Sequence, residues 1–247
     1  MNNQKLNLAK EVVLDLTKKS GIEGQVARVM LCIDRSGSMS ELYRDGTVQK
    51  VISRLVPIAM AFDDNQEMEV VVFDDEAQTV KSVTTSNLDN YVQKVLNKLD
   101  FGGTNYAPAI KEVMKLHGTP YSIGAEIVGF IKSIFGKKKE VESVKVDIPT
   151  YVIFITDGEN FDERETESVL IEASKQGIFF QFVGIGGSRF PQLERLDTME
   201  GRFIDNANFF SISTKDLVSL PDNQFYSKLL YEYPDWVKLA KSKNIIL

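Results

Sequence analysis

Five side chains with hard oxygen donors follow or border apolar segments of the sequence: Asp34, Ser36, Ser38, Thr104 and Asp157. Hard divalent cations take oxygen ligands, and Mg²⁺ keeps several waters where few carboxylates bind it. The two carboxylates balance the charge of one Mg²⁺, and the three hydroxyls add ligands without adding charge. The set predicts one Mg²⁺ site, in which Mn²⁺ could substitute; Ca²⁺ is also open, although it usually takes more oxygens.

The spacing of the first three donors favours a shared site. In extended backbone, residues i, i+2 and i+4 point the same way, so Asp34, Ser36 and Ser38 are expected on one side of their loop. Gly37 permits a tight turn between the serines. We expect the three hydroxyls of the set to bind the ion directly, and the two carboxylates to bind it directly or through water.

Each piece of this set also has a simpler explanation. A Ser-Gly-Ser loop is usually a turn and a helix cap, and Asp157-Gly158 is a common turn. Thr104 could cap a helix that begins near Ala107. The metal site is favoured because all the pieces follow expected strands or open expected helices, where the fold would bring them together.

Short apolar runs alternate with amphipathic stretches along the chain, which predicts an α/β fold with a doubly wound, mostly parallel sheet flanked by helices. Ligands of such sheets gather at the carboxyl ends of the strands. The runs suit strands buried on both faces. Strands are expected at 26–33, 69–73, 151–155 and 178–185. Helices are expected at 47–62, which Pro57 should disturb, and at 88–99, 107–116 and 163–174.

The remaining segments suggest how the chain is organised. Residues 1–24 are expected to form a helical segment packed on the core, and residues 25–247 the main domain. That domain would carry an insertion at 118–147 and helices from residue 222 that dock back onto it. Apolar positions at 123–135 and the nearby lysines allow a membrane-surface or partner helix over 123–139, but a partly packed insertion with solvated lysines is the favoured interpretation.

Composition excludes several classes of protein. The 247 residues are 43% apolar and 26% charged, which is typical of a globular domain with a sizeable core. A net charge of −6 argues against nucleic-acid binding. One cysteine, Cys32, leaves no intrachain disulfide and favours a reducing, cytoplasmic location. One histidine, His117, argues against a histidine-based metal site or hydrolase. No apolar stretch reaches the 18 residues expected of a membrane span.

The candidate site resembles the metal-ion-dependent adhesion site (MIDAS) of von Willebrand factor type A (vWA) domains. That pattern is Asp-x-Ser-x-Ser, a distant Thr, and an Asp in a Thr-Asp-Gly turn, and it reads here as Asp34 to Ser38, Thr104, and Thr156 to Gly158. The resemblance covers roughly Gln25 to Ser213. It implies a six-stranded, mostly parallel sheet with one antiparallel edge strand at about 77–83.

Further segments resemble a bacterial, cytoplasmic vWA subfamily linked to tellurium-resistance and stress-response operons; copines share the general domain. These segments are 62–64, 102–106, 152–158, 181–186, 205–210 and 233–236. The resemblance implies metal-dependent binding, with a carboxylate from a partner often completing the metal's ligands. It does not identify the partner.

Three functional hypotheses follow. The first is a non-enzymatic binding module that uses its Mg²⁺ to capture an acidic group of a protein partner. The alternative is a metal-dependent hydrolase such as a phosphohydrolase, against which the sequence lacks a second set of carboxylates, a base and a phosphate-cradling loop. An aspartyl nucleophile at Asp34 would resemble Asp-x-Asp, but Ser36 holds that second position. The third is a structural protein that keeps the loop only for folding.

Overall fold

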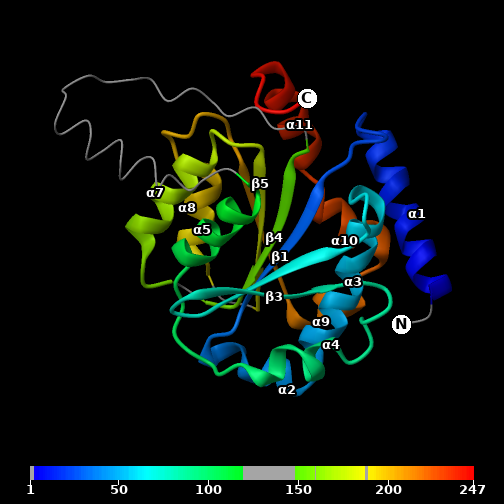
Figure 1. Ribbon diagram of the computed structural model, residues 1–247, viewed down its shortest axis with the longest axis vertical. Helices are drawn as coiled ribbons and strands as arrows, with labels where there is room; N and C mark the ends of the chain where they lie inside the picture. The colour runs from blue at the N-terminus through cyan, green and yellow to red at the C-terminus, as the bar shows by residue number, and fades with distance from the viewer. Residues whose placement is uncertain (1–2, 119–147, 159, 187–188) are drawn as a thin grey trace.

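The computed structural model describes residues 3–118, 148–158, 160–186 and 189–247 (Figure 1). Within them, a six-stranded sheet has the order β3-β2-β1-β4-β5-β6, and only the edge pair β2–β3 is antiparallel. The strands are β1 (Arg28–Asp34), β2 (Met68–Phe73), β3 (Ala77–Val83), β4 (Thr150–Thr156), β5 (Ile178–Ile185) and β6 (Ala207–Ile212). The expected mostly parallel sheet and its antiparallel edge strand are confirmed.

Helices cover both faces of this sheet (Figure 1). On one face lie α5 (Ala107–Leu116), α7 (Glu163–Ala173) and α8 (Pro191–Thr198). On the other lie α1 (Asn3–Lys19), α3 (Thr47–Phe62), α4 (Tyr91–Lys94), α9 (Thr214–Ser219), α10 (Asp222–Leu229) and α11 (Tyr233–Ser242). The short α2 (Ser40–Arg44) follows β1, and 3₁₀ turns cover Gly37–Met39 and Leu96–Lys98.

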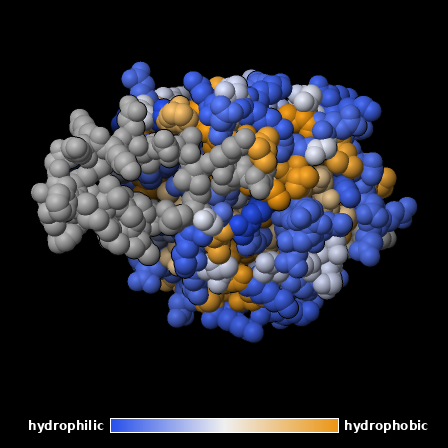
Figure 2. All heavy atoms as spheres, turned by 45° about the horizontal axis from the view of Figure 1, so that its top comes forward, coloured by the Kyte–Doolittle hydropathy of each residue, from blue (hydrophilic) through white to orange (hydrophobic). Residues whose placement is uncertain are grey.

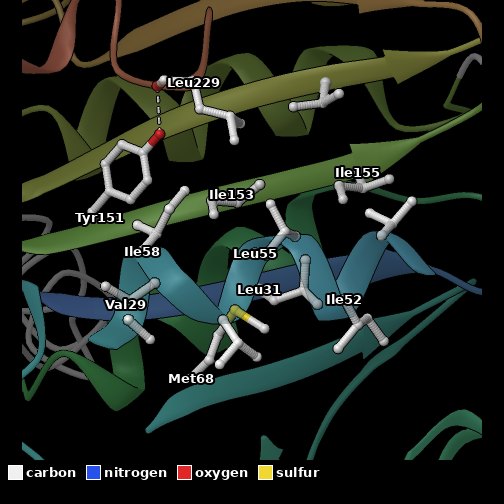
Figure 3. Packing of buried hydrophobic residues seen from close by; sticks show 14 of the residues in the cluster. Val29, Leu31, Ile52, Leu55, Ile58, Met68, Tyr151, Ile153, Ile155 and Leu229 are labelled. Carbon is white, nitrogen blue, oxygen red and sulfur yellow. Dashed lines mark hydrogen bonds between the residues drawn. The ribbon is translucent and has the colours of Figure 1, made fainter. Parts of the chain in front are cut away.

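Two hydrophobic clusters, one on each face, hold the layers together. Alternate residues of β1 enter different clusters: Leu31 belongs to the one under α3, and Cys32 to the one under α5. Figure 3 shows side chains of α3, including Leu55 and Ile58, packed over β1 and β4. Since β1 and β4 are buried at nearly every position, the carboxyl ends of these two neighbouring strands are rigidly placed.

The N-terminal and C-terminal helices pack on the same face of the sheet. Helix α1 buries Leu6, Ala9 and Val13 in the cluster that also contains α3 and α10. Tyr233 and Trp236 of α11 lie against aromatic rings of the sheet. All but residue 118 of the segment expected as an insertion at 118–147 lies outside the described residues, as does the 123–139 segment considered for membrane contact.

The prediction of one helix over 88–99 is wrong. The structure has only the four-residue α4 and a 3₁₀ turn there, although Leu88 and Val92 are buried as the apolar spacing suggested. Gln49 of α3 explains the difference: its Nε2 donates to Leu88 O (2.9 Å) and its Oε1 accepts from Val92 N (3.0 Å). These contacts satisfy backbone groups that a longer helix would have paired, and Asn90 adopts a left-handed φ of 61° between them.

The described residues include no helix long and apolar enough to span a membrane. The face seen in Figure 2 is largely hydrophilic, with separate hydrophobic groups between the charged side chains.

Candidate metal site

Asp34 ends β1 at the centre of the sheet and is fully buried. Both of its carboxylate oxygens accept hydrogen bonds. Oδ1 accepts from Ser36 N at 2.6 Å, and Oδ2 accepts from Thr156 Oγ1 at 2.6 Å. Because Thr156 ends the adjacent strand β4, the second bond ties together the ends of two neighbouring parallel strands.

The hydroxyls of Ser36 and Ser38 continue from Asp34 towards the surface. Their Oγ atoms lie 2.9 Å apart, and Ser38 Oγ donates to Asp157 Oδ1 at 2.7 Å. Ser36 stands at the N-cap of the 3₁₀ turn, yet its side chain makes no capping bond. The simple capping interpretation therefore does not describe this loop, whose oxygens contact one another and a carboxylate. Four of the five expected site residues form one connected cluster.

Thr104, the fifth expected residue, is placed beside this cluster by its backbone. Ser36 and Gly102 form an isolated parallel bridge, in which Gly37 N donates to Gly102 O at 3.1 Å. On its other side, Thr104 O accepts from Phe161 N at 3.0 Å. Thr104 is 6% exposed, and the described contacts contain no hydrogen bond from its side chain to the other four residues.

Helix α5 is capped by Asp162, not by Thr104. The Asp162 carboxylate accepts from Tyr106 N at 3.0 Å and from Ala107 N at 2.8 Å, while Asn160 Nδ2 donates to Asp162 Oδ1 at 2.6 Å. The side chain of Thr104 is consequently not committed to a helix cap. A cap supplied from 55 residues away gives no local signal in the sequence.

Two tyrosines and Thr156, none of them among the five expected site residues, support the cluster. Tyr43 Oη donates to Asp34 O at 2.9 Å. Tyr106 Oη donates to Gly158 O at 2.5 Å and lies 3.2 Å from Thr156 Oγ1. Both tyrosines are buried, Tyr43 in α2 and Tyr106 directly before α5, and so resemble ordinary core residues in the sequence. The one signal is that a buried tyrosine hydroxyl requires a polar partner.

The electrostatics of the site disfavour two bare carboxylates. Burial raises the pKa of Asp34 to about 6, against the opposing hydrogen bonds from Thr156 and Ser36, and burial also raises the pKa of Asp157. Arg35 lies between Asp34 and Ser36, but its Nε donates to Leu99 O at 3.0 Å and its guanidinium packs over Phe101. A divalent cation would compensate the charge that burial penalises.

The donor set fits a small hard cation. Carboxylate and hydroxyl oxygens suit Mg²⁺ or Mn²⁺, and the exposed side of Ser38 and the half-buried Asp157 leave an approach from solvent. The described residues contain no group of three or more His, Cys, Asp or Glu side chains placed to hold a metal. This site has two carboxylates and depends on hydroxyls for the rest of its protein ligands, so that finding does not count against it.

The surface around the cluster carries exposed aromatic side chains. Phe161, whose backbone nitrogen bonds to Thr104 O, is 83% exposed. Phe101 is 41% exposed and lies under the Arg35 guanidinium. The exposed ring of Phe161 is therefore held next to the loop of Thr104.

Comparison with known proteins shows a family model and a relative that each match nearly the whole chain. The model of the vWA-TerF-like family, described as the vWA domain found in the TerF C terminus, matches residues 26–246. An uncharacterized protein of Bacillus subtilis, YcbR, is 34% identical over 98% of this chain and 90% of its own length.

Two solved structures are similar in fold. Proximal thread matrix protein 1 of the mussel byssus has a TM-score of 0.54 at 18% identity, covering 83% of this chain and 48% of that one. An aerotolerance-related membrane protein of Bacteroides fragilis has a TM-score of 0.50 at 18% identity, covering 85% of this chain and 99% of that one. At these identities the likeness concerns the fold alone.

Proposed function

The chain belongs to the vWA-TerF-like family, and on that premise we propose that it is a binding module that uses a divalent metal ion to capture an acidic group of a protein partner. We propose Mg²⁺ as the ion, with Mn²⁺ able to substitute. The observation that carries the proposal is the connected cluster of Asp34, Ser36, Ser38 and Asp157 at the carboxyl ends of β1 and β4.

The chain's own residues would share the work of holding the ion. Ser36 and Ser38 would turn their hydroxyl lone pairs to it, and Thr104 would add a third hydroxyl from its loop. Asp34, held by Thr156 and by the Ser36 backbone, would balance part of the ion's charge from the buried side of the site. Asp157 would balance the rest from the side that faces solvent. When bound, the ion supplies an electrophilic centre for one more oxygen.

An outside carboxylate is the expected last ligand. The two carboxylates of the site only balance a divalent charge, and the hydroxyl ligands are neutral, so an added anion meets little net repulsion. Phe161, exposed beside the Thr104 loop, would contact an apolar group next to that carboxylate.

The proposal is tested by calorimetry and by capture of partners. Mg²⁺ titrated into the wild-type protein should bind at one site, and Asp157→Ala should weaken that binding. Partner capture from native lysate should occur in Mg²⁺, vanish in EDTA and return when Mg²⁺ is restored. Asp235→Ala, an equal charge loss on the exposed start of α11, is the matched control and should behave as wild type. A partner retained equally in Mg²⁺ and EDTA would refute the mechanism.

The alternative is a metal-dependent hydrolase such as a phosphohydrolase. In the described residues the site offers one set of two carboxylates, and no second metal cluster accompanies it. His117 is buried at the end of α5, bonded to Thr150, and is not part of the cluster. Metal-dependent turnover in a phosphoester screen, lost in Asp157→Ala, would favour this alternative.

The biological setting is part of the same proposal. We place the protein in the cytoplasm of a bacterium, in a tellurium-resistance or stress-response system, from the sequence resemblance and the single cysteine. A third role, in which the loop serves folding alone, would appear as metal-dependent melting without any metal-dependent partner.

A further inference from the structure

An acidic cleft lies beside the candidate metal site. It has a volume of about 430 Å³, and its lining includes four carboxylates, those of Asp74, Asp75, Glu76 and Asp100. Asp75, Glu76 and Asp100 are exposed, whereas Asp74 is half-buried. The lining contains a single basic side chain, that of Arg35. Four carboxylates facing one guanidinium give the cleft a net negative charge.

The segments that line this cleft are part of the loops of the metal site or are bonded to them. Arg35 stands between Asp34 and Ser36 in the first loop of the site. The acidic turn after β2 is fastened to the loop of Thr104: Gly103 N donates to Asp75 Oδ2 at 2.8 Å, and Asn105 N donates to Asp74 O at 2.8 Å. A Cβ atom added to Gly102 would lie 2.9 Å from Asp74 Cβ, so the two loops leave little room for a larger residue at Gly102.

One buried donor of Arg35, a residue that lines the cleft, has no acceptor in the part of the chain that the structure describes. Its side chain is almost fully buried; Nε and Nη2 both donate to Leu99 O, and the guanidinium packs over Tyr43 and Phe101. Its buried Nη1 has no hydrogen-bond partner among the described residues. A buried donor of this kind calls for an acceptor such as a carbonyl oxygen, which a bound peptide backbone supplies.

We propose that this cleft binds a Lys or Arg side chain of the same partner whose carboxylate completes the metal site. The rim carboxylates attract the cationic head, and Arg35 Nη1 donates to a backbone carbonyl of the bound segment. The inference rests on the proposed function and narrows it, because the recognised surface then carries an acidic and a basic residue close together.

The test is a selection from a random peptide library in Mg²⁺, with bound peptides released by EDTA. Wild-type protein should enrich peptides that contain Asp or Glu together with Lys or Arg. The double variant Glu76→Gln with Asp100→Asn should still enrich acidic peptides but lose the enrichment of Lys and Arg. Glu11→Gln with Asp15→Asn removes two exposed carboxylates of α1 instead, and should select the same peptides as wild type.

A synthetic peptide from this selection makes the test quantitative. Changing its basic residue to Gln should weaken binding to the wild-type protein by about fivefold and flatten the salt dependence. The same change should have no effect with the Glu76→Gln, Asp100→Asn variant. If the peptides released by EDTA are acidic but show no enrichment of Lys or Arg, this inference is wrong and the proposed function still stands. Failure to recover EDTA-released acidic peptides would overturn both.

Discussion

Asp34 is the residue on which folding and function conflict most sharply. Its carboxylate is buried and its pKa is raised to about 6, so in the absence of metal its ionised form opposes folding at neutral pH. The hydrogen bonds from Ser36 N and Thr156 Oγ1 hold it in place nevertheless. A buried charge kept in this way is expected where a bound cation compensates it.

Replacing Asp34 by Asn should therefore separate stability from metal binding. The amide can accept from Ser36 N and donate to Thr156 Oγ1, and it carries no charge. A carboxyl with a raised folded-state pKa contributes stability at low pH that is lost as pH rises, so at pH 7 the change should stabilise the metal-free protein by about 1–3 kcal/mol. Urea unfolding in EDTA measures this.

Saturating Mg²⁺ should reverse that order of stability. Wild type should gain stability with metal concentration, and Asp34→Asn should not respond. A variant that is less stable than wild type in EDTA, or that responds equally to Mg²⁺, would contradict this account of Asp34.

Phe161 provides a second prediction at the scale of the residue. Its side chain is 83% exposed, so Phe161→Ala should change the free energy of unfolding by less than about 0.5 kcal/mol. Partner capture in Mg²⁺ should nevertheless weaken, because the ring stands beside the site. Tyr231→Ala, which removes another ring that is 75% exposed from the turn between α10 and α11, is the matched control. Equal effects of both changes on capture would show that Phe161 has no special role.

At the scale of the element, the capping role of Asp162 can be separated experimentally from the metal-binding role proposed for Thr104. Asp162→Ala removes the cap of α5 and should lower the free energy of unfolding by about 1–2 kcal/mol. Thr104→Val removes only a hydroxyl that takes no part in that cap, so its main effect should be weaker Mg²⁺ binding. Thermal melting measures the stability of both variants, and calorimetry measures their Mg²⁺ binding. A larger loss of stability for Thr104→Val would restore the capping role to Thr104.

Protonation of His117, at the end of α5, should make the free energy of unfolding depend on pH. Burial and the nearby Arg28 lower the pKa of His117 to about 4, so the folded protein holds this histidine neutral. A group with a lowered folded-state pKa binds its proton in the unfolded chain first, so its contribution is present above about pH 6.5 and is lost as pH falls towards 4. Between pH 7 and pH 5 the wild type should lose about 2 kcal/mol relative to His117→Gln.

The measurement compares urea unfolding of the two proteins at both pH values. The comparison with His117→Gln is necessary because Asp34 and Asp197, with pKa values raised to about 6, contribute in the opposite direction in both proteins. Parallel stability curves for wild type and variant would contradict the assignment to His117.

Most of the fold could be predicted because its elements carry strong local patterns. Helix α3 has the bounds expected from its apolar spacing, with Pro57 inside it, and strand β5 has the bounds of its apolar run. The element that failed, at 88–99, depends on a side chain of α3 that satisfies its backbone groups from 39 residues away. Contacts of that kind depend on the assembled fold and leave no periodic signal.

The candidate site was predictable for a related reason. Asp34, Ser36 and Ser38 occupy one short loop, and the other two expected residues follow β4 or border α5, so the order of elements was enough to bring them near one another. The cap by Asp162, the support from Tyr43 and Tyr106, and the acidic cleft arise from packing between distant loops. The expected insertion remains a prediction, and so does the favoured interpretation that it is partly packed, with membrane contact as the alternative.

At the scale of the whole molecule, the central claim is that this fold exists to present one metal ion at the carboxyl edge of its sheet. The most direct measurement is a crystal structure of the protein soaked in Mn²⁺, with an anomalous difference map. We expect one strong peak about 2.1 Å from the hydroxyl oxygens of Ser36, Ser38 and Thr104, with Asp34 and Asp157 bound directly or through water, and with a water or an outside anion as the last ligand. A map at saturating Mn²⁺ with no peak among these five residues would contradict the account.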